Sequence, residues 1–398
     1  MSSKHFEYYW LEGHDGFYKG TLSVAFASGG LSLFGSSSII LWIWLRALRP
    51  KKSTIFHRIL LGLSFSDIMT TLSLMMTPFM LPVESGYPVA LGNFTTCNVA
   101  GFLLQYYLSV SLYNCALSFY YVLMIVHGWS EDRIQRLMEP WVHIVCLSVP
   151  IIYGTLCILT DTINPTDLAG TCEFGSYPAG CLEEEHGIPC ERGKNTVTIS
   201  WGFVVILKVS ALIGIINTIR VYLAVRKTSR RSTRDSMTGA TERRLKSVAV
   251  QSYLYTFAFV NSFLWATAIR LASQFHNWDN RSGDNVILCV VFFFTYMFFP
   301  LQGFLNGVTF LRPRLQQYQQ RHPEAGIVRA YCQIMSSHQH HSGSTAVLSG
   351  GVDDSEQIDC CGKNGTASTA SRGLAATMNS ERSKLETVDE EASNETDS

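Results

Sequence analysis

Residues 97–126 read CNVAGFLLQYYLSVSLYNCALSFYYVLMIV and contain no Asp, Glu, Lys or Arg. A helix of this length extends about 45 Å at 1.5 Å per residue, which exceeds the roughly 30 Å of hydrocarbon in a bilayer. The whole chain has 398 residues, of which 16% are charged, whereas a soluble domain has about 25% charged residues. The stretch therefore predicts a helix that crosses a membrane.

Six further stretches are nearly as poor in charge. Two of them contain one charge each, Asp67 in residues 59–83 and Lys208 in residues 196–219. A single central charge costs about 2.5–3.5 kcal/mol on insertion scales and does not prevent insertion. We therefore predict an all-α membrane protein with a seven-transmembrane helix bundle over residues 21–311. The predicted helices cover about residues 21–45, 59–83, 97–126, 140–160, 196–226, 244–270 and 285–311.

Basic residues in the connecting segments predict the orientation of the bundle. Lys and Arg are concentrated between helices one and two, three and four, and five and six, and again after helix seven. Cytoplasmic loops carry an excess of these residues, so residues 1–20 are predicted outside and the C-terminus cytoplasmic, in a multi-pass protein of the plasma membrane. The formal net charge is +0, so no global field argues for a nucleic-acid partner.

The chain changes character after helix seven. Residues 312–335 begin with RPRLQQYQQRHP and are predicted as an amphipathic juxtamembrane segment, with Leu315 and Tyr318 toward lipid and the arginines toward anionic head groups. Residues 336–398 are rich in Ser, Thr and Gly and have no periodic apolar face. They are predicted to form a disordered cytoplasmic tail.

Four cysteines lie in segments predicted to be outside, where an oxidising compartment favours disulfides. Three pairings of four cysteines exist. The favoured pairing joins Cys97 to Cys172, which would tie the loop after helix four over the mouth of the bundle, and Cys181 to Cys190 as a local ring. The other pairings remain open, as does the choice between a pocket lid and a plain staple.

Two outer segments also match the pattern of N-glycosylation, at Asn93 and Asn280.

Taken together, seven spans with the N-terminus outside, a cysteine opening helix three and a basic third inner loop resemble a G-protein-coupled receptor. Within that superfamily, GLSFSD at residues 62–67 and PLQGFLN at residues 300–306, followed by RPR, are similar to cyclic-AMP-receptor-like or rhodopsin-like receptors of protist or fungal kind. The resemblance covers about residues 23–318. It implies a non-enzymatic receptor that transduces an extracellular small-molecule or peptide ligand into activation of a heterotrimeric G protein, with membrane lipids around it.

Parts of the rhodopsin-like pattern are missing. FYYVL at residues 119–123 stands where Asp-Arg-Tyr is expected, and helix six has no proline near Trp265. Helix seven has Phe299-Pro300 in place of Asn-Pro. The activation switches that depend on those residues are therefore not carried over.

Asp67 is the most informative residue within the spans. A carboxylate at mid-depth is expected to face the interior of the bundle and to be paired. By resemblance, this position corresponds to a sodium-binding acid that senses the receptor state, with Ser111 on helix three as a second ligand. The alternative is a carboxylate satisfied by hydroxyls such as Ser64 or Ser111 without an ion.

A ligand pocket is predicted from Lys208, about 15 Å down helix five at 1.5 Å per residue, together with Gln105 and Trp265 at similar depth. Snorkelling is the alternative for Lys208, and packing is the alternative for the aromatic ring. Contacts with the G protein are predicted for basic residues at the inner ends of helices five and six, which positive-inside topology also explains: Arg226, Lys227, Arg243, Arg244 and Lys246.

Other seven-helix classes fit less well. A retinal protein needs a lysine in helix seven, and residues 285–311 have none. A transporter or channel without G-protein coupling remains the alternative function, because Gly29-Gly30 and Pro300 could interrupt helices. His143 is alone within the spans, so neither a metal site nor a catalytic constellation is predicted. Apart from a candidate sodium ion at Asp67, no cofactor is expected.

Overall fold

The computed structural model describes residues 15–47, 54–166, 170–178, 181–182, 189–232, 239–275 and 286–336. Three expectations fall outside these residues: the outer segment before residue 15, glycosylation at Asn280, and the disordered tail after residue 336.

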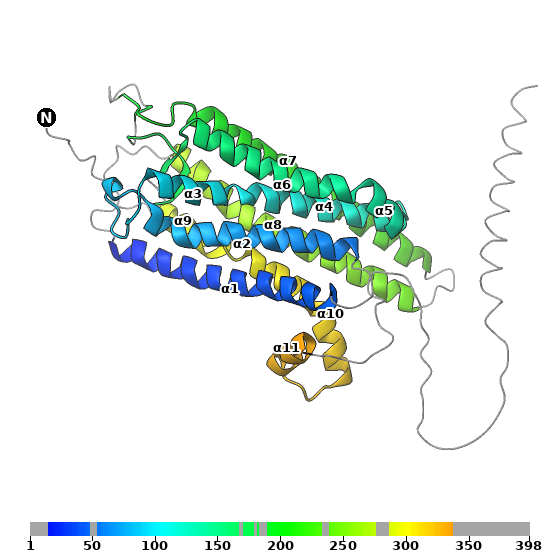
Figure 1. The fold of residues 1–398 in the computed structure, drawn as a ribbon. Coiled ribbons are helices and arrows are strands. Elements are labelled where there is room, and N and C mark those ends of the chain that lie inside the picture. The colour runs from blue at the N-terminus through cyan, green and yellow to red at the C-terminus, as the bar shows by residue number, and fades with distance from the viewer. Residues whose placement is uncertain are drawn as a thin grey trace, which may run out of the picture. The chain divides into compact units, whose positions relative to one another are not determined.

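The described residues form a bundle of long helices that run alongside one another (Figure 1). Five helical spans in them are long and apolar enough to cross a membrane, and a bent helix pair gives a sixth. The remaining long helix, α8, contains 37 residues and packs beside α7, α9 and α10. The predicted all-α membrane bundle is confirmed. The long helices are α1 (Asp15–Ala47), α2 (Ile55–Met80), α3 (Phe94–Leu104) with α4 (Tyr106–Ile125), α6 (Glu139–Leu159), α7 (Thr196–Ser232), α8 (Gly239–Phe275), and α9 (Val286–Phe298) with α10 (Gln302–Arg321).

Helix seven of the prediction is broken into α9 and α10. Phe299, Pro300 and Leu301 lie between the two helices, whose axes differ by 46°. Proline lacks an N–H and its ring clashes with the preceding turn, which breaks or kinks a helix. The break places Gln302 at the start of a new helix.

Backbone contact joins α10 to α1. A Cβ added at Gly35 would lie 2.6 Å from the carbonyl oxygen of Gly303, and one added at Gly307 would lie 2.9 Å from the Cα of Gly35. Small residues spaced four apart let two membrane helices approach this closely. The position of α10 is therefore fixed on its α1 side.

A small hairpin covers the outer end of the bundle. It consists of β1 (Ile163–Pro165) and β2 (Cys172–Phe174), which pair antiparallel with Ile163 opposite Phe174. The short 3-10 helix η1 (Val83–Ser85) lies in the connection between α2 and α3. On the inner side, α5 (Glu131–Leu137) connects α4 to α6 and is capped by Ser130.

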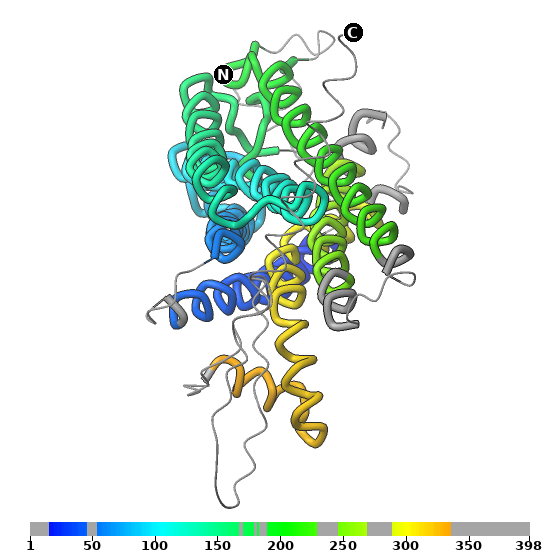
Figure 2. Tube along the Cα trace, turned by 90° about the vertical axis from the view of Figure 1, so that its right-hand side faces the viewer, coloured from blue at the N-terminus to red at the C-terminus, as the bar shows by residue number. Residues whose placement is uncertain are grey.

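Two helices occupy the residues that were predicted as one juxtamembrane segment. Residues 312–321 continue α10 through Pro313, and α11 (Ile327–Ser336) follows after a turn. Figure 2 shows the second half of α10 projecting away from the other long helices, with α11 beside it. The chain therefore turns back on itself after helix seven.

Candidate functional site

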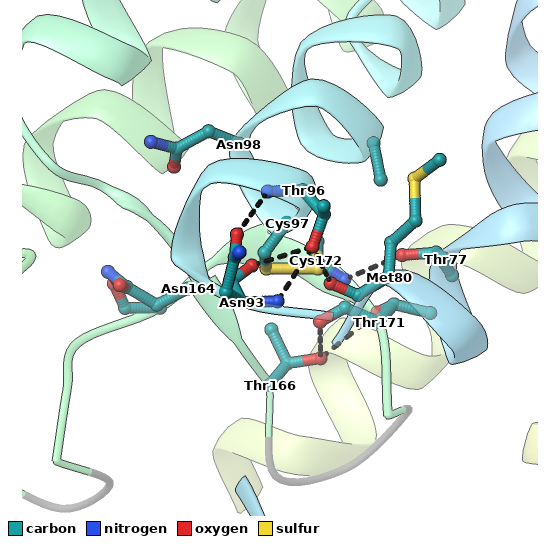
Figure 3. The surroundings of a disulfide bond; sticks show 12 residues. Thr77, Met80, Asn93, Thr96, Cys97, Asn98, Asn164, Thr166, Thr171 and Cys172 are labelled. Atoms are coloured by element: carbon teal, nitrogen blue, oxygen red, sulfur yellow. Dashed lines mark hydrogen bonds between the residues drawn. A yellow bond between two sulfur atoms is a disulfide. The ribbon is translucent and has the colours of Figure 1, made fainter. Parts of the chain in front are cut away.

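The outer hairpin is held to two transmembrane helices at once. A disulfide joins Cys97 at the start of α3 to Cys172 in β2, across 75 residues of sequence (Figure 3). The backbone N–H of Cys172 also donates to Thr77 Oγ1 of α2 at 3.0 Å. Next to the bridge, Thr96 Oγ1 donates to the carbonyl of Met80 at 2.8 Å. The loop after helix four is thus fastened by the pairing that the sequence favoured.

Apolar side chains from α1, α2, α3 and α6 pack under this hairpin. Ile163 and Cys172 are fully buried among them, together with Tyr18, Leu81, Tyr87, Cys97, Ala100 and Cys157. The Tyr87 hydroxyl donates to the carbonyl of Thr166 at 2.8 Å. A packed lid therefore covers the described part of the outer end.

Arg192 connects its own segment to three others at the outer end. Its guanidinium lies 3.0 Å from the Asp161 carboxylate, donates through Nε to Asn164 Oδ1 at 2.9 Å and donates through Nη2 to Asn98 Oδ1 at 3.3 Å. The same group lies 4.9 Å from the ring of Phe94. Arg192 therefore braces the segment before α7 against α3, β1 and the end of α6. Nothing in the sequence near Arg192 signals these distant partners.

The second disulfide lies close to Arg192 in the chain. Cys181 is bonded to Cys190 across nine residues, again the favoured pairing.

Asn93, one predicted glycosylation site, is exposed and caps α3: its Oδ1 accepts from the backbone N–H of Thr96 at 3.0 Å. Since Oδ1 makes the cap, glycosylation through the amide nitrogen is compatible with it.

The three predicted pocket residues lie in three separate environments. Lys208 is exposed on α7, beside the exposed Val205 and Val209, so its predicted place in the interior is corrected. Helix α7 turns Phe203, Leu207 and Ser210 inward instead. The error arose because depth along a helix does not define its rotation.

Gln105 and Trp265 are both inside the bundle, each with contacts of its own. Gln105 lies at the break between α3 and α4, where its Nε2 donates to the carbonyl of Gly101 at 3.0 Å. Trp265 stacks on Phe294 and Phe298 of α9, with ring centroids 4.8 Å and 5.9 Å away. Trp265 therefore packs α8 against helix seven.

Asp67 is buried and paired, as expected for a carboxylate at mid-depth. Its Oδ2 accepts a hydrogen bond of 2.9 Å from Asn306 Nδ2 on α10. Ser111 is hydrogen-bonded to Ser210 on α7, so its predicted place beside Asp67 is corrected. Asn306 belongs to the PLQGFLN motif. That its side chain points toward Asp67 depends on the rotation of α10, which the motif does not define.

Several buried polar atoms near this pair have no hydrogen-bond partner among the described residues. They include both amide atoms of Gln302, one turn before Asn306, and Oδ1 of Asn306 itself. On α2 and α4 they include Ser64 Oγ and the Tyr107 hydroxyl. Buried polar atoms are nearly always satisfied by protein or water. The donor set of carboxylate, amide and hydroxyl oxygens suits water or a hard cation.

At the inner end, tyrosine side chains fill the region where the arginine of the rhodopsin-like Asp-Arg-Tyr motif is missing. The ring of Phe56 lies 6.3 Å, 6.2 Å and 6.4 Å from those of Tyr120, Tyr121 and Tyr255. All four are almost fully buried. The hydroxyls of Tyr120 and Tyr121 have no hydrogen-bond partner in the described chain. We name these four residues the inner aromatic cluster.

Ion pairs at the inner end are concentrated on the side of α2 and α6. Arg58 forms two hydrogen bonds with the carboxylate of Glu139, the second of them at 2.8 Å. The Glu131 carboxylate accepts from the backbone N–H of Ile55 at 3.0 Å. Helices α2, α5 and α6 are therefore tied together below the membrane.

Of the predicted coupling residues, Arg226, Lys227 and Lys246 are exposed at the inner ends of α7 and α8. Arg243 and Arg244 belong to α8, but their side chains lie outside the described residues. Two to three turns further into the bundle, the two helices are linked by Thr218 and Thr256, whose hydroxyls are 2.6 Å apart.

Comparison with known families identifies the bundle. The model of the Frizzled/Smoothened family membrane region matches residues 83–297, just over half of the chain. No curated protein matches the chain. The family match supports the G-protein-coupled receptor superfamily but not the cyclic-AMP-receptor-like or rhodopsin-like type. The chain belongs to the Frizzled/Smoothened family of receptor-like, multi-pass proteins of the plasma membrane, which are signalling proteins rather than enzymes.

Proposed function

We propose that this protein is a receptor that converts the binding of an extracellular small molecule or peptide into activation of a heterotrimeric G protein. Family membership supports a receptor role in general. The observation that carries the G-protein step is the length of α7 and α8. Each has 37 residues and extends about 55 Å, well beyond roughly 30 Å of hydrocarbon, so both present basic inner ends.

The mechanism in this proposal is a population shift. A ligand that binds one arrangement of the helices better raises the population of that arrangement. Movement of α8 would carry Tyr255 away from the other three residues of the inner aromatic cluster and open a cleft between α7 and α8 for the G protein. Ligand and G protein are then reciprocally coupled, because each favours the same arrangement.

GTP exchange tests this proposal directly. Membranes with and without the protein are assayed with a panel of Gα subunits, using the wild type and the double variant Arg243→Glu with Arg244→Glu. We expect exchange above background for the wild type and its loss in the variant. Lys19→Glu with Lys194→Glu makes the same charge change on the outer side and is expected to leave exchange intact at equal surface level. Equal exchange by wild type and inner variant would refute the coupling role of these arginines.

Asp67 and Asn306 are proposed as a state switch that joins α2 to α10. A sodium ion there would be held by the Asp67 carboxylate with Asn306 Oδ1 and Gln302 Oε1, and it would neutralise the buried charge. Ser111 is not part of this set, because its hydroxyl is bonded to Ser210.

The test compares ligand-free exchange in sodium chloride and in choline chloride. We expect sodium to lower exchange by the wild type and by Ser111→Ala, and to have no effect on Asp67→Asn. Sodium sensitivity that persists in Asp67→Asn would exclude the site at Asp67.

A transporter or channel is the second candidate function. The break between α9 and α10 beside the buried Asp67, Gln302 and Asn306 favours it, since broken helices next to polar groups form transport sites. Proteoliposomes under a sodium or potassium gradient, read with a potential-sensitive dye, separate the two functions. Flux that Asp67→Asn abolishes, without GTP exchange on any Gα subunit, would favour the transporter.

A further inference from the structure

The ring of His143 has a polar neighbour at each of its two nitrogens. Its Nδ1 lies 3.0 Å from the hydroxyl of Tyr113 on α4, and its Nε2 lies 3.9 Å from Oε1 of Glu139, one turn earlier on α6. The Glu139 carboxylate in turn accepts two hydrogen bonds from Arg58 of α2. The imidazole therefore stands where polar groups of α2, α4 and α6 meet.

Both contacts fit an uncharged imidazole. The Tyr113 side chain is fully buried, and its hydroxyl has His143 as its hydrogen-bond partner among the described residues. A neutral ring has one nitrogen that accepts and one that donates. A phenol that donates to Nδ1 assigns the ring proton to Nε2, which faces the Glu139 carboxylate.

A second proton on the ring would disturb both contacts. Both nitrogens of an imidazolium are donors, so Nδ1–H and the phenol O–H would point at each other. The Tyr113 oxygen can accept from Nδ1–H only if its own hydrogen turns away, and a buried donor without an acceptor destabilises the fold. At Nε2, the new positive charge would approach a carboxylate that Arg58 already neutralises, and the two cations would repel each other.

Tight packing prevents the tyrosine from moving aside alone. A Cβ added at Gly62 would lie 2.5 Å from the Tyr113 hydroxyl oxygen, so the phenol rests directly on the backbone of α2. The ring of Tyr113 also lies 5.8 Å from that of His143, measured between centroids. A change at His143 is therefore passed through Tyr113 to the contact of α4 with α2.

The imidazole lies near the cytosolic end of its helix. Glu139 is the first residue of α6, and His143 follows about 6 Å further along the axis. The His143 side chain is 31% exposed, against 14% for Glu139. A proton from the cytosol can therefore reach the ring without crossing the bundle.

Histidine is the group in this cluster whose charge changes near neutral pH, ordinarily between about pH 5 and 8. Phenols and thiols ordinarily titrate above this range and carboxylates below it, while a guanidinium stays charged. The ionisable groups described around the ring are of these kinds: Glu139 and Cys146 of α6, Arg58 of α2, and Tyr113 and Cys115 of α4.

We propose that His143 is a proton-responsive link among α2, α4 and α6. Uptake of a cytosolic proton by the imidazole weakens its hydrogen bond with Tyr113 and the hold of Arg58 on Glu139. The inner end of the bundle is therefore firmest while the ring is neutral, and it loosens as the cytosol becomes acidic.

Thermal unfolding of the purified full chain at about pH 7.5 and about pH 5.5, inside the range in which histidine titrates, tests this link. In His143→Gln, the amide can still accept from Tyr113 and face Glu139, but it takes up no proton. Tyr113→Phe keeps the histidine and removes the opposing donor. The matched control is His127→Gln, because His127 is exposed in the turn after α4.

We expect the midpoint of the wild type to fall between the two pH values by about 2–4 °C more than that of His143→Gln, a shift typical of losing about one hydrogen bond. Tyr113→Phe should unfold at a lower temperature than the wild type at the higher pH, with a smaller further fall on acidification. His127→Gln should keep the full pH dependence of the wild type.

A His143→Gln protein with the full pH dependence of the wild type would overturn the proposal, as would a wild-type midpoint that rises on acidification. Loss of the pH dependence in His127→Gln would place the titrating group elsewhere and would equally refute the link. If His143→Gln does not fold, Tyr113→Phe decides the matter, since an undiminished pH dependence there would show that the phenol does not oppose the proton.

Discussion

The two ends of the bundle are held together by different forces. At the outer end, the Cys97–Cys172 disulfide and the Arg192 network connect the loops to α3, β1 and the end of α6, and a second disulfide closes a local ring. At the inner end, the inner aromatic cluster fills the space among α2, α4 and α8, and the Tyr120 and Tyr121 hydroxyls are unsatisfied among the described residues. Covalent and ionic braces resist displacement, whereas aromatic contacts can be exchanged. For the proposed receptor mechanism, we therefore expect the helices to rearrange at the inner end while the outer end stays closed.

At the inner end, some helices are held by more polar or backbone contacts than others. Arg58 with Glu139, and Glu131 with the start of α2, tie α2, α5 and α6. Glycine contacts fix α10 to α1. Between α7 and α8, the hydrogen bond described is that of Thr218 with Thr256. This difference favours α7 and α8 as the moving elements.

Removal of the long-range disulfide should have the largest effect. In the chain-entropy model, a bridge across 75 residues stabilises the fold by about 4 kcal/mol. We expect Cys97→Ser with Cys172→Ser to lower the thermal midpoint of the purified protein and to reduce its delivery to the cell surface.

The smaller ring is the internal control for that variant. A bridge across nine residues is worth about 3 kcal/mol in the same model, and Cys181–Cys190 does not link two spans. Cys181→Ser with Cys190→Ser should therefore lower the midpoint less and preserve surface delivery. Equal losses for the two pairs would contradict the view that the outer end is braced through Cys97.

The backbone contact between α1 and α10 gives the next prediction. A Cβ at residue 35 would lie 2.6 Å from backbone atoms of Gly303 and Phe304, so the helices must separate. Overpacking of this kind costs about 1–3 kcal/mol, and we expect Gly35→Ala to lower the thermal midpoint accordingly. Gly30→Ala, where nothing lies within 4 Å, should leave it unchanged or raise it. A stable Gly35→Ala protein would show that α10 can move relative to α1.

Arg192 should contribute less to the free energy of unfolding than the Cys97–Cys172 disulfide or the contact at Gly35. Its side chain is 21% exposed and that of Asp161 is 55% exposed, so water screens the pair. Loss of its hydrogen bonds in Arg192→Ala should cost about 1–2 kcal/mol, measured as a shift of the thermal midpoint. Arg192→Lys keeps the charge but cannot bond two asparagines in the same planar geometry. We expect it to recover less than half of the loss; complete recovery would mean that the charge alone matters.

The sequence predicted the helices well and the site only in part. Stretches without charge define spans because lipid excludes unpaired charge. The disulfides could be predicted because few cysteines lie on the outer side of the membrane. The predictions for Lys208 and Ser111 were wrong for a different reason: Lys208 is exposed, and Ser111 is bonded to Ser210. Their roles depend on the rotation of α4 and α7, and the apolar residues of these helices show little helical periodicity to define it. The partners of Arg192 lie far away in sequence, so no local pattern could reveal them.

The smallest change in thermal midpoint is expected for variants of the inner aromatic cluster. It distinguishes an inner end whose helices can move from a rigid one. The Tyr120 and Tyr121 hydroxyls are buried without a partner among the described residues, and a buried polar group without a hydrogen bond destabilises the folded protein. Tyr120→Phe and Tyr121→Phe remove that cost while keeping the rings. We expect thermal midpoints that are unchanged or higher, with ligand-free GTP exchange unchanged or lower, because the cluster packs better when closed. A lower midpoint in both variants would mean that water or another group satisfies the hydroxyls, and the inner end would then be braced as firmly as the outer one.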